Sequence, residues 1–213
     1  MGGGRKTPVL LSLVFLALMV GPAIYRFLQF ELLVEWVVGG GGIVVYALWQ
    51  AYESRISVAE LDKEEALHDA GTMPLAAVAK LILLMTAMLG GGIQRYELGA
   101  LALVVFLAGV VLRSVAVNSL QGHYSHRIRR PPTLVTTGVY GWIRHPAYAG
   151  TLLAHAAVPL FFPNPYALAG FWLAWLPAVI IRTLVEDRFL RRDLGQEYEA
   201  YAARTSRLIP GIW

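Results

Sequence analysis

The sequence contains no cysteine, and charged residues make up only 15% of its 213 positions. The absence of cysteine excludes disulfides, thiolate metal sites and a cysteine nucleophile. The scarcity of charge leaves 57% of the residues hydrophobic, with a mean hydropathy of +0.56. One small water-soluble core cannot use that much apolar surface. We therefore predict an integral membrane protein with the lipid bilayer as its partner.

Apolar runs long enough to cross a bilayer, which takes about 20 helical residues, recur along the chain. They lie at 8–28, 32–52, 74–92 and 97–118, and a longer run covers 147–185. Pro163-Asn164-Pro165 interrupts the longer run, and proline ends helices, so this run predicts a hairpin of two helices. The predicted fold is all-α, a bundle of six transmembrane helices in one membrane domain, 1–213, followed by a C-terminal tail. The first run is interpreted as a retained helix rather than a cleaved signal peptide.

Lysine and arginine are distributed unevenly between the predicted loops. If both termini lie on one side, the segments on that side hold 13 Lys and Arg residues, whereas the other side holds Arg26 and Arg95. Because Lys and Arg are retained on the cytoplasmic side, both termini are predicted to be cytoplasmic. Lys80, Arg113 and Arg182 fall inside spans near their cytoplasmic ends, where long side chains can snorkel to the interface. This patterning accounts for the net charge of +4, so no nucleic-acid partner is predicted.

Three other features receive a structural interpretation. Glycine clusters at 39–42 and 90–92 predict close helix packing, and a dimer through them is possible but not required, so the oligomeric state stays open. The acidic segment 53–73, which begins with Glu53, predicts a solvated cytoplasmic helix or loop without chemistry. His155 on the fifth span is expected to be a packing histidine.

Polar residues concentrate in the segment 119–150 and in the tail after the hairpin. Arg144 and His145 directly precede the fifth span, and Glu186 and Asp187 end the sixth. The hairpin therefore brings the two groups to the same membrane face. A cation, an imidazole and two carboxylates at a lipid boundary are costly unless they are paired or functional. By themselves these residues fit a topology determinant with local ion pairs as well as they fit an active site.

Two segments on either side of the hairpin turn carry a recognisable set of motifs. They are GVYGWIRHPAYAG before the turn and EDRFLRRDLGQEYEAYAARTSRLIPG after it. Their ordered motifs resemble the isoprenylcysteine carboxyl methyltransferase family over about residues 105–211. The paired glutamates of the family appear here as Glu186-Asp187, and its Phe-Gly as Leu194-Gly195. Residues 1–104 contain only generic spans. The residues that carry the resemblance, besides the acidic pair, are Gly138, Tyr140, Arg144, His145, Pro146, Tyr148, Gly150, Leu190, Gly195, Tyr198, Tyr201, Arg207 and Pro210.

The resemblance implies an S-adenosylmethionine-dependent methyltransferase whose cofactor-binding half is 105–213. The cationic amino acid end of the cofactor needs a carboxylate partner, which Glu186 supplies, and its carboxylate needs a donor such as His145 or a backbone amide. Glu186 is the stronger candidate of the acidic pair because Asp187 is shorter. The implied cofactor-binding set is Leu134, Val135 and Tyr140 around adenine and ribose, Pro146 and Tyr148 in the wall, and Gly138, His145, Glu186 and Asp187.

Arg144 and Glu186 are the predicted catalytic residues. Methyl transfer is an in-line displacement that demands alignment and exclusion of water, so no metal is predicted. A carboxylate acceptor can be oriented by Arg144, whereas an amine acceptor can lose its proton to Glu186 or a tyrosine. The acceptor is expected to be lipophilic and to enter between helices from the bilayer. An isoprenylcysteine carboxylate, an amine headgroup and a small thiol all stay open.

Three other interpretations are weighed against a methyltransferase. A metal site at His123 and His126, with His145 nearby, is disfavoured because the chain has only five histidines and the other two lie far from this cluster in sequence. Membrane sterol reductases share a related C-terminal arrangement and would use NADPH there. A non-catalytic scaffold or transport component would make Glu35, Lys80 and Arg113 the important intramembrane residues. Cofactor binding discriminates among these classes.

Overall fold

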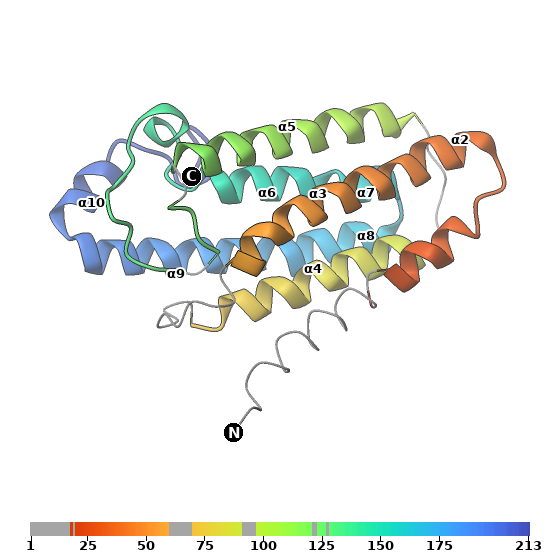
Figure 1. The fold of residues 1–213 in the computed structure, drawn as a ribbon, viewed down its shortest axis with the longest axis horizontal. Coiled ribbons are helices and arrows are strands. Elements are labelled where there is room, and N and C mark those ends of the chain that lie inside the picture. The colour runs from red at the N-terminus through yellow and green to blue at the C-terminus, as the bar shows by residue number, and fades with distance from the viewer. Residues whose placement is uncertain (1–17, 19, 60–69, 91–96, 121–122, 127) are drawn as a thin grey trace, which may run out of the picture.

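The computed structural model describes residues 18, 20–59, 70–90, 97–120, 123–126 and 128–213 (Figure 1). Regular structure in these residues is entirely helical apart from one isolated bridge, which confirms the predicted all-α class. The elements in chain order are α2 (Leu33–Glu35), η1 (Trp36–Gly40), α3 (Gly41–Ala59), α4 (Thr72–Leu89), α5 (Leu98–Ser119), η2 (Gly138–Gly141), α6 (Pro146–Ala156), α7 (Val158–Phe161), α8 (Pro165–Ala169), η3 (Gly170–Trp175), α9 (Leu176–Leu194) and α10 (Gln196–Ala202).

Four continuous helical segments of the described chain are long and apolar enough to cross a membrane. At most 39% of each apolar window is buried inside the bundle, so most of these side chains face outward, as lipid contact requires. The fifth predicted span is helical but divided into α6 and α7, of 11 and 4 residues. The first predicted span, 8–28, lies mostly outside the described residues. The four segments are Leu33–Ser54, Thr72–Leu89, Leu98–Ser119 and Pro165–Leu194.

The predicted hairpin turn is confirmed, and Asn164 is its central residue. The Asn164 Oδ1 atom accepts a hydrogen bond from the backbone amide of Ala167 at 2.8 Å and so caps α8, which begins with Pro165. The Asn164 Nδ2 atom donates to the carbonyl oxygen of Phe162 at 3.1 Å and to that of Ala87 at 3.4 Å. The same side chain therefore closes the turn and fastens it to the end of α4.

Helices α5 and α6 approach closely through two glycines. A Cβ atom on Gly109 would lie 2.3 Å from the backbone nitrogen of Ala154, and one on Gly150 would lie 2.5 Å from that of Arg113. No side chain fits at either position without moving a backbone. These glycines set the distance between α5 and α6. Helix α5 leads into the segment after Ser119, and α6 directly follows Arg144 and His145.

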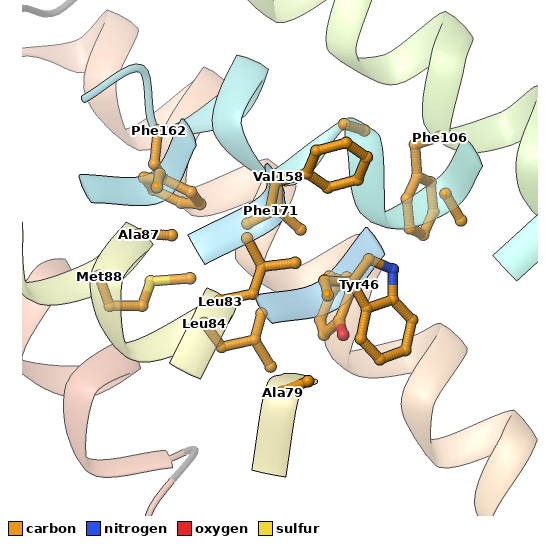
Figure 2. Close-up of a cluster of buried hydrophobic side chains, with 14 of the residues drawn as sticks. Tyr46, Ala79, Leu83, Leu84, Ala87, Met88, Phe106, Val158, Phe162 and Phe171 are labelled. Carbon is orange, nitrogen blue, oxygen red and sulfur yellow. The ribbon is translucent and has the colours of Figure 1, made fainter. Parts of the chain in front are cut away.

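The apolar core lies between α3, α4, α5, α7 and η3, where Leu83, Phe106 and Phe171 are buried together (Figure 2). The glycine cluster of the second span serves this packing, as predicted: a Cβ atom on Gly42 would lie 2.8 Å from the Phe161 ring. Residues 91 and 92 of the second cluster lie outside the described residues.

His155 is a buried packing histidine, as expected. Its Nε2 lies 2.9 Å from the Tyr46 hydroxyl, its Nδ1 lies 2.8 Å from the Thr151 carbonyl oxygen, and its ring lies against Trp175. Both ring nitrogens are therefore satisfied inside the bundle.

Cations inside the spans are paired within the bundle. Arg182 donates to the hydroxyl of Thr72 at 2.9 Å, and Lys80 donates to the side-chain oxygen of Gln50 at 2.9 Å. Arg113 pairs with Glu53, and both Arg113 and Arg182 are buried. The expectation that these side chains snorkel to the interface is therefore wrong for the two arginines, because acceptors on neighbouring elements satisfy them first.

Candidate functional site

Two groups of polar residues, 42 positions apart in sequence, meet at one end of the bundle. His145 directly precedes α6, and its Nε2 lies 3.2 Å from Oδ1 of Asp187 in α9. The Nε of Arg144 donates to the same oxygen at 2.9 Å. The predicted meeting of these groups through the hairpin is confirmed. Figure 1 shows α10, the C terminus and the loop before α6 at this end of the bundle.

Asp187 is the centre of this cluster. Its Oδ1 also accepts a hydrogen bond from the Tyr198 hydroxyl at 2.8 Å. Its Oδ2 accepts bonds from Arg207 at 3.1 Å and Arg191 at 3.3 Å. The side chain is only 4% exposed, so a carboxylate there depends on these charged donors. Asp187 thus joins the loop before α6, the end of α9, α10 and the tail.

The tail is also joined to the Arg144-His145 motif through its backbone. Ile143 and Ser206 form the isolated parallel bridge, in which the amide of Arg144 donates to Ser206 at 2.9 Å. The amide of His145 donates to the Arg207 carbonyl at 3.2 Å. Gly195, with a φ of +55°, makes the turn from α9 into α10 that brings the tail back to this motif.

An open cavity lies beside the cluster and encloses about 800 Å³, its mouth included. Most of the predicted site residues line it, whereas Gly138, Pro146 and Asp187 are outside its lining. Gly138 instead begins η2 with a φ of +61°, and Pro146 is fully buried as the first residue of α6. The predicted residues that line the cavity are Leu134, Val135, Tyr140, Arg144, His145, Tyr148 and Glu186.

The two predicted catalytic side chains have different surroundings. Glu186 lines the cavity and forms no ion pair with any described residue. Arg144 uses its Nε for Asp187 and its Nη1 for the carbonyl oxygens of Ala202 and Thr205. None of the hydrogen bonds in the described chain uses the Arg144 Nη2. Glu186 is hydrogen-bonded to Tyr148 but has no cation as a partner, so its charge is available to a ligand, whereas Arg144 is largely committed to holding the tail.

Tyrosines of the tail complete the wall, and the residue set predicted from sequence omitted them. Tyr198 and Tyr201 of α10 line the cavity and are buried. The Tyr201 hydroxyl donates to the Tyr140 carbonyl at 2.8 Å. Burial, and secondly Asp187, raises the pKa of Tyr198, so this hydroxyl stays a donor. Their i, i+3 spacing, which places both on one helix face, is the signal that was available in the sequence.

A second polar cluster, around Arg113 and Glu53, lies behind the lining residues Tyr124 and Ala147. The Glu53 side chain is 13% exposed, and its Oε2 lies 2.5 Å from Nη2 of Arg113. The expectation of a solvated acidic segment is therefore wrong for Glu53, because α3 continues past the apolar run and turns this residue inward. Arg113 also donates to the hydroxyl of Tyr124, which lines the cavity.

His123 and His126 lie on the segment after α5, and His123 lines the cavity. The His123 ring nitrogen lies 3.2 Å from the carbonyl oxygen of Leu120. Burial, and secondly the charge of Arg113, lowers the pKa of His126 to about 4. Within the described residues, no three His, Asp or Glu side chains are arranged to hold a metal ion.

Comparison with known sequences gives matches in the same part of the chain. Residues 100–192 match the model of the isoprenylcysteine carboxyl methyltransferase (ICMT) family. A rice protein named "Probable protein-S-isoprenylcysteine O-methyltransferase" is 33% identical over 114 residues, which are 52% of this chain and 60% of that protein. The protein-S-isoprenylcysteine O-methyltransferase of Dictyostelium discoideum is 27% identical over 125 residues, or 56% and 52% of the two chains. The matches thus cover about half to three fifths of these relatives.

Comparison with solved structures extends the likeness to the N-terminal spans. The structure of the eukaryotic intramembrane Ras methyltransferase ICMT matches with a TM-score of 0.61 and 24% identity, over 93% of this chain and 74% of that one. At this identity the match shows a shared fold. Together with the four apolar helices, the shared fold makes this chain an integral membrane protein.

Proposed function

We propose that the chain belongs to the isoprenylcysteine carboxyl methyltransferase family, whose model residues 100–192 match, and that it is a membrane methyltransferase that uses S-adenosylmethionine. One observation carries the choice of cofactor: Glu186 faces an open cavity without an ion pair, beside a wall of apolar and aromatic residues. A ligand with one cationic end and one flat aromatic end fits these surroundings.

The residues present fit this cofactor at each of its parts. Glu186 would hold the cationic amine, and the Arg144 Nη2 would meet the cofactor carboxylate. Leu134, Val135 and Tyr140 would flank the adenosine. When bound, the cofactor supplies a methyl group on a positively charged sulfur, whose charge is lost on transfer. The proposed cofactor-binding half is 105–213.

The chain itself contributes alignment and exclusion of water. Asp187 fixes Arg144, His145 and Tyr198, and these three side chains line the cavity. We therefore assign Asp187 to positioning and Glu186 to contact with the cofactor. His145 supports the wall through its Nε2 contact with Asp187.

The proposed acceptor is the carboxylate of an isoprenylated cysteine, which agrees with the names of the relatives. A carboxylate is already anionic at neutral pH, so the site needs no base to prepare it. The prenyl chain would reach the cavity between helices from the bilayer. We propose that the cavity opens to the cytoplasm and that both termini lie on that side, because Lys and Arg concentrate there.

Calorimetric titration of the detergent-purified protein tests the cofactor. We expect binding of S-adenosylmethionine and S-adenosylhomocysteine but not of NADPH. Glu186→Gln should weaken binding of S-adenosylmethionine at least about tenfold, which is ~1.4 kcal/mol. Glu199→Gln removes an exposed carboxylate at the same end of the bundle and should change little. Heat from NADPH alone, or from none of the three ligands, would reject a methyltransferase.

The acceptor is tested by transfer of a labelled methyl group to defined compounds. Farnesylcysteine should become a methyl ester that base hydrolyses, and phosphatidylethanolamine should stay unlabelled. Base-stable label on the phospholipid would instead assign an amine acceptor to the same cofactor site.

A further inference from the structure

We propose that Glu53, in the N-terminal spans, is a positioning residue for the cavity and acts through Arg113. This inference deepens the proposed function and rests on it for the identity of the site. Glu53 lies outside the segment 100–192 that matches the methyltransferase family. If the proposal holds, the N-terminal spans contribute to the site and are more than a generic membrane anchor.

The pair between Glu53 and Arg113 has two parallel bonds. The Arg113 Nε donates to Oε1 at 2.7 Å, and Nη2 donates to Oε2 at 2.5 Å. The side chains are 6% exposed for Arg113 and 13% for Glu53. A fork of two bonds fixes the plane of the guanidinium as well as its distance, which one bond cannot do. Glu53 therefore determines how the remaining donors of Arg113 are aimed.

Those remaining donors reach the cavity wall. The Arg113 Nη2 also donates to the Tyr124 hydroxyl at 3.1 Å, and the guanidinium carbon lies 5.4 Å from the centre of the Tyr124 ring. The Nη1 donates to the Thr151 hydroxyl at 2.9 Å and to the Ala147 carbonyl at 3.3 Å. Both Tyr124 and Ala147 line the cavity. One cation thus holds the segment after α5 and the start of α6 in a fixed relation.

Removal of the Glu53 charge would leave a buried guanidinium with only neutral acceptors. Glu186, on the cavity wall that Tyr124 and Ala147 share, is a carboxylate that forms no ion pair with any described residue. An Arg113 released from Glu53 would be drawn toward the cavity, and Tyr124 would lose its fixed position. If the ion pair between α3 and α5 is purely structural, removal of the Glu53 charge should lower only the stability of the protein. If Glu53 positions Arg113, its removal should also change the position or exposure of the residues around Tyr124 in the cavity wall.

A matched control lies one turn earlier on α3. Gln50 accepts a hydrogen bond from Lys80 of α4 at 2.9 Å, which is also an interhelical polar contact inside the membrane. Neither Gln50 nor Lys80 is in the cavity lining. Gln50→Leu therefore tests loss of a polar contact between spans, and Glu53→Gln tests loss of the charge that orients Arg113.

The first measurement is independent of catalysis, and it uses the absence of cysteine. Ser125, next to Tyr124 in the lining, is replaced by cysteine, and the rate of maleimide labelling is measured in detergent. We expect Glu53→Gln to raise the rate several-fold and Gln50→Leu to leave it unchanged. Equal labelling rates in the Glu53→Gln variant, in the Gln50→Leu variant and in the protein with neither change would overturn the positioning role. This result does not depend on which reaction the protein catalyses.

The second measurement separates the kinetic constants of methyl transfer. Glu53→Gln should lower kcat/KM for farnesylcysteine at least about tenfold, or ~1.4 kcal/mol, and Glu53→Asp should recover part of the loss. The dissociation constant of S-adenosylhomocysteine should stay within about threefold. Gln50→Leu should lower thermal stability without lowering kcat/KM. If wild-type protein binds no methyl cofactor, the proposed function fails, and the labelling result still decides the role of Glu53.

Discussion

Glu186 and Asp187 are consecutive in the chain, yet Asp187 is enclosed by donors and Glu186 lines the cavity without an ion pair. Successive residues on a helix point about 100° apart, so only one of the two can face the Arg144-His145 motif. The acidic pair therefore combines a carboxylate that organises the site with one that is available to a ligand.

This division predicts opposite behaviour for two isosteric variants. Asp187→Asn should lower the free energy of unfolding by about 3–5 kcal/mol, because the buried arginines lose their counter-charge. Glu186→Gln should leave stability unchanged and should instead weaken cofactor binding. Thermal unfolding in detergent, followed by tryptophan fluorescence, provides the comparison. Equal melting temperatures for the two variants would contradict the division.

The contact between α5 and α6 predicts a steric effect at Gly150. A methyl group there meets the backbone nitrogen of Arg113 at 2.5 Å, which no rotamer change relieves. Gly150→Ala should cost about 1–3 kcal/mol of stability through overpacking. Gly41→Ala is the control, since no heavy atom lies within 4 Å of a Cβ at Gly41 in α3. The control should be neutral or stabilising by up to about 1 kcal/mol, and a similar loss in both variants would refute the steric cause.

His126 predicts a pH dependence of stability. Burial, and secondly Arg113, lowers the pKa of His126 to about 4 from its ordinary value of 6.5. Below pH 6.5 the unfolded chain binds a proton that the folded protein does not bind. The contribution of this residue is therefore complete above pH 6.5 and declines as the pH falls toward 4, by at most about 1.4 kcal/mol per pH unit. Melting temperatures between pH 7 and 4.5 should fall less steeply for His126→Gln than for wild type, and parallel curves would disprove this assignment.

The proposed orientation predicts which face of the membrane each end of the bundle occupies. Ile212 is 78% exposed at the end that carries the cavity, and Tyr166 is 60% exposed in α8 at the opposite end (Figure 1). Single cysteines, Ile212→Cys and Tyr166→Cys, can be labelled with a membrane-impermeant maleimide because the chain has no other thiol. Position 212 should react only in inverted vesicles and position 166 only in intact cells. The reverse pattern would place the cavity outside the cytoplasm.

Much of the arrangement of the site could be predicted from local sequence. Pro163 and Pro165 mark a turn between two apolar runs of known length, so the distance along the chain determines which residues return to the same face. The return of the Glu186-Asp187 pair to the face that carries His145 follows from that geometry. The apolar runs likewise predict the helices, because bilayer thickness sets their length.

Contacts between distant helices could not be predicted in this way. In sequence, Glu53 looks like the other acidic residues of the segment that it begins. Nothing in the neighbouring residues indicates that it pairs with Arg113, which is 60 positions away in the chain. Which member of the Glu186-Asp187 pair faces the cavity depends on the rotation of α9. That rotation is set by Tyr198 and the arginines, which come from the tail and from the loop before α6.

The bridge between Ile143 and Ser206 has a consequence for the biogenesis of the protein. The strand-like residues before α6 leave the ribosome well before their partners in the tail have been translated. During membrane insertion the amides of Arg144 and His145 therefore lack their final acceptors, Ser206 and Arg207. The cavity takes its final shape only after the last helix has entered the bilayer, so a nascent chain remains without a formed ligand site throughout its insertion.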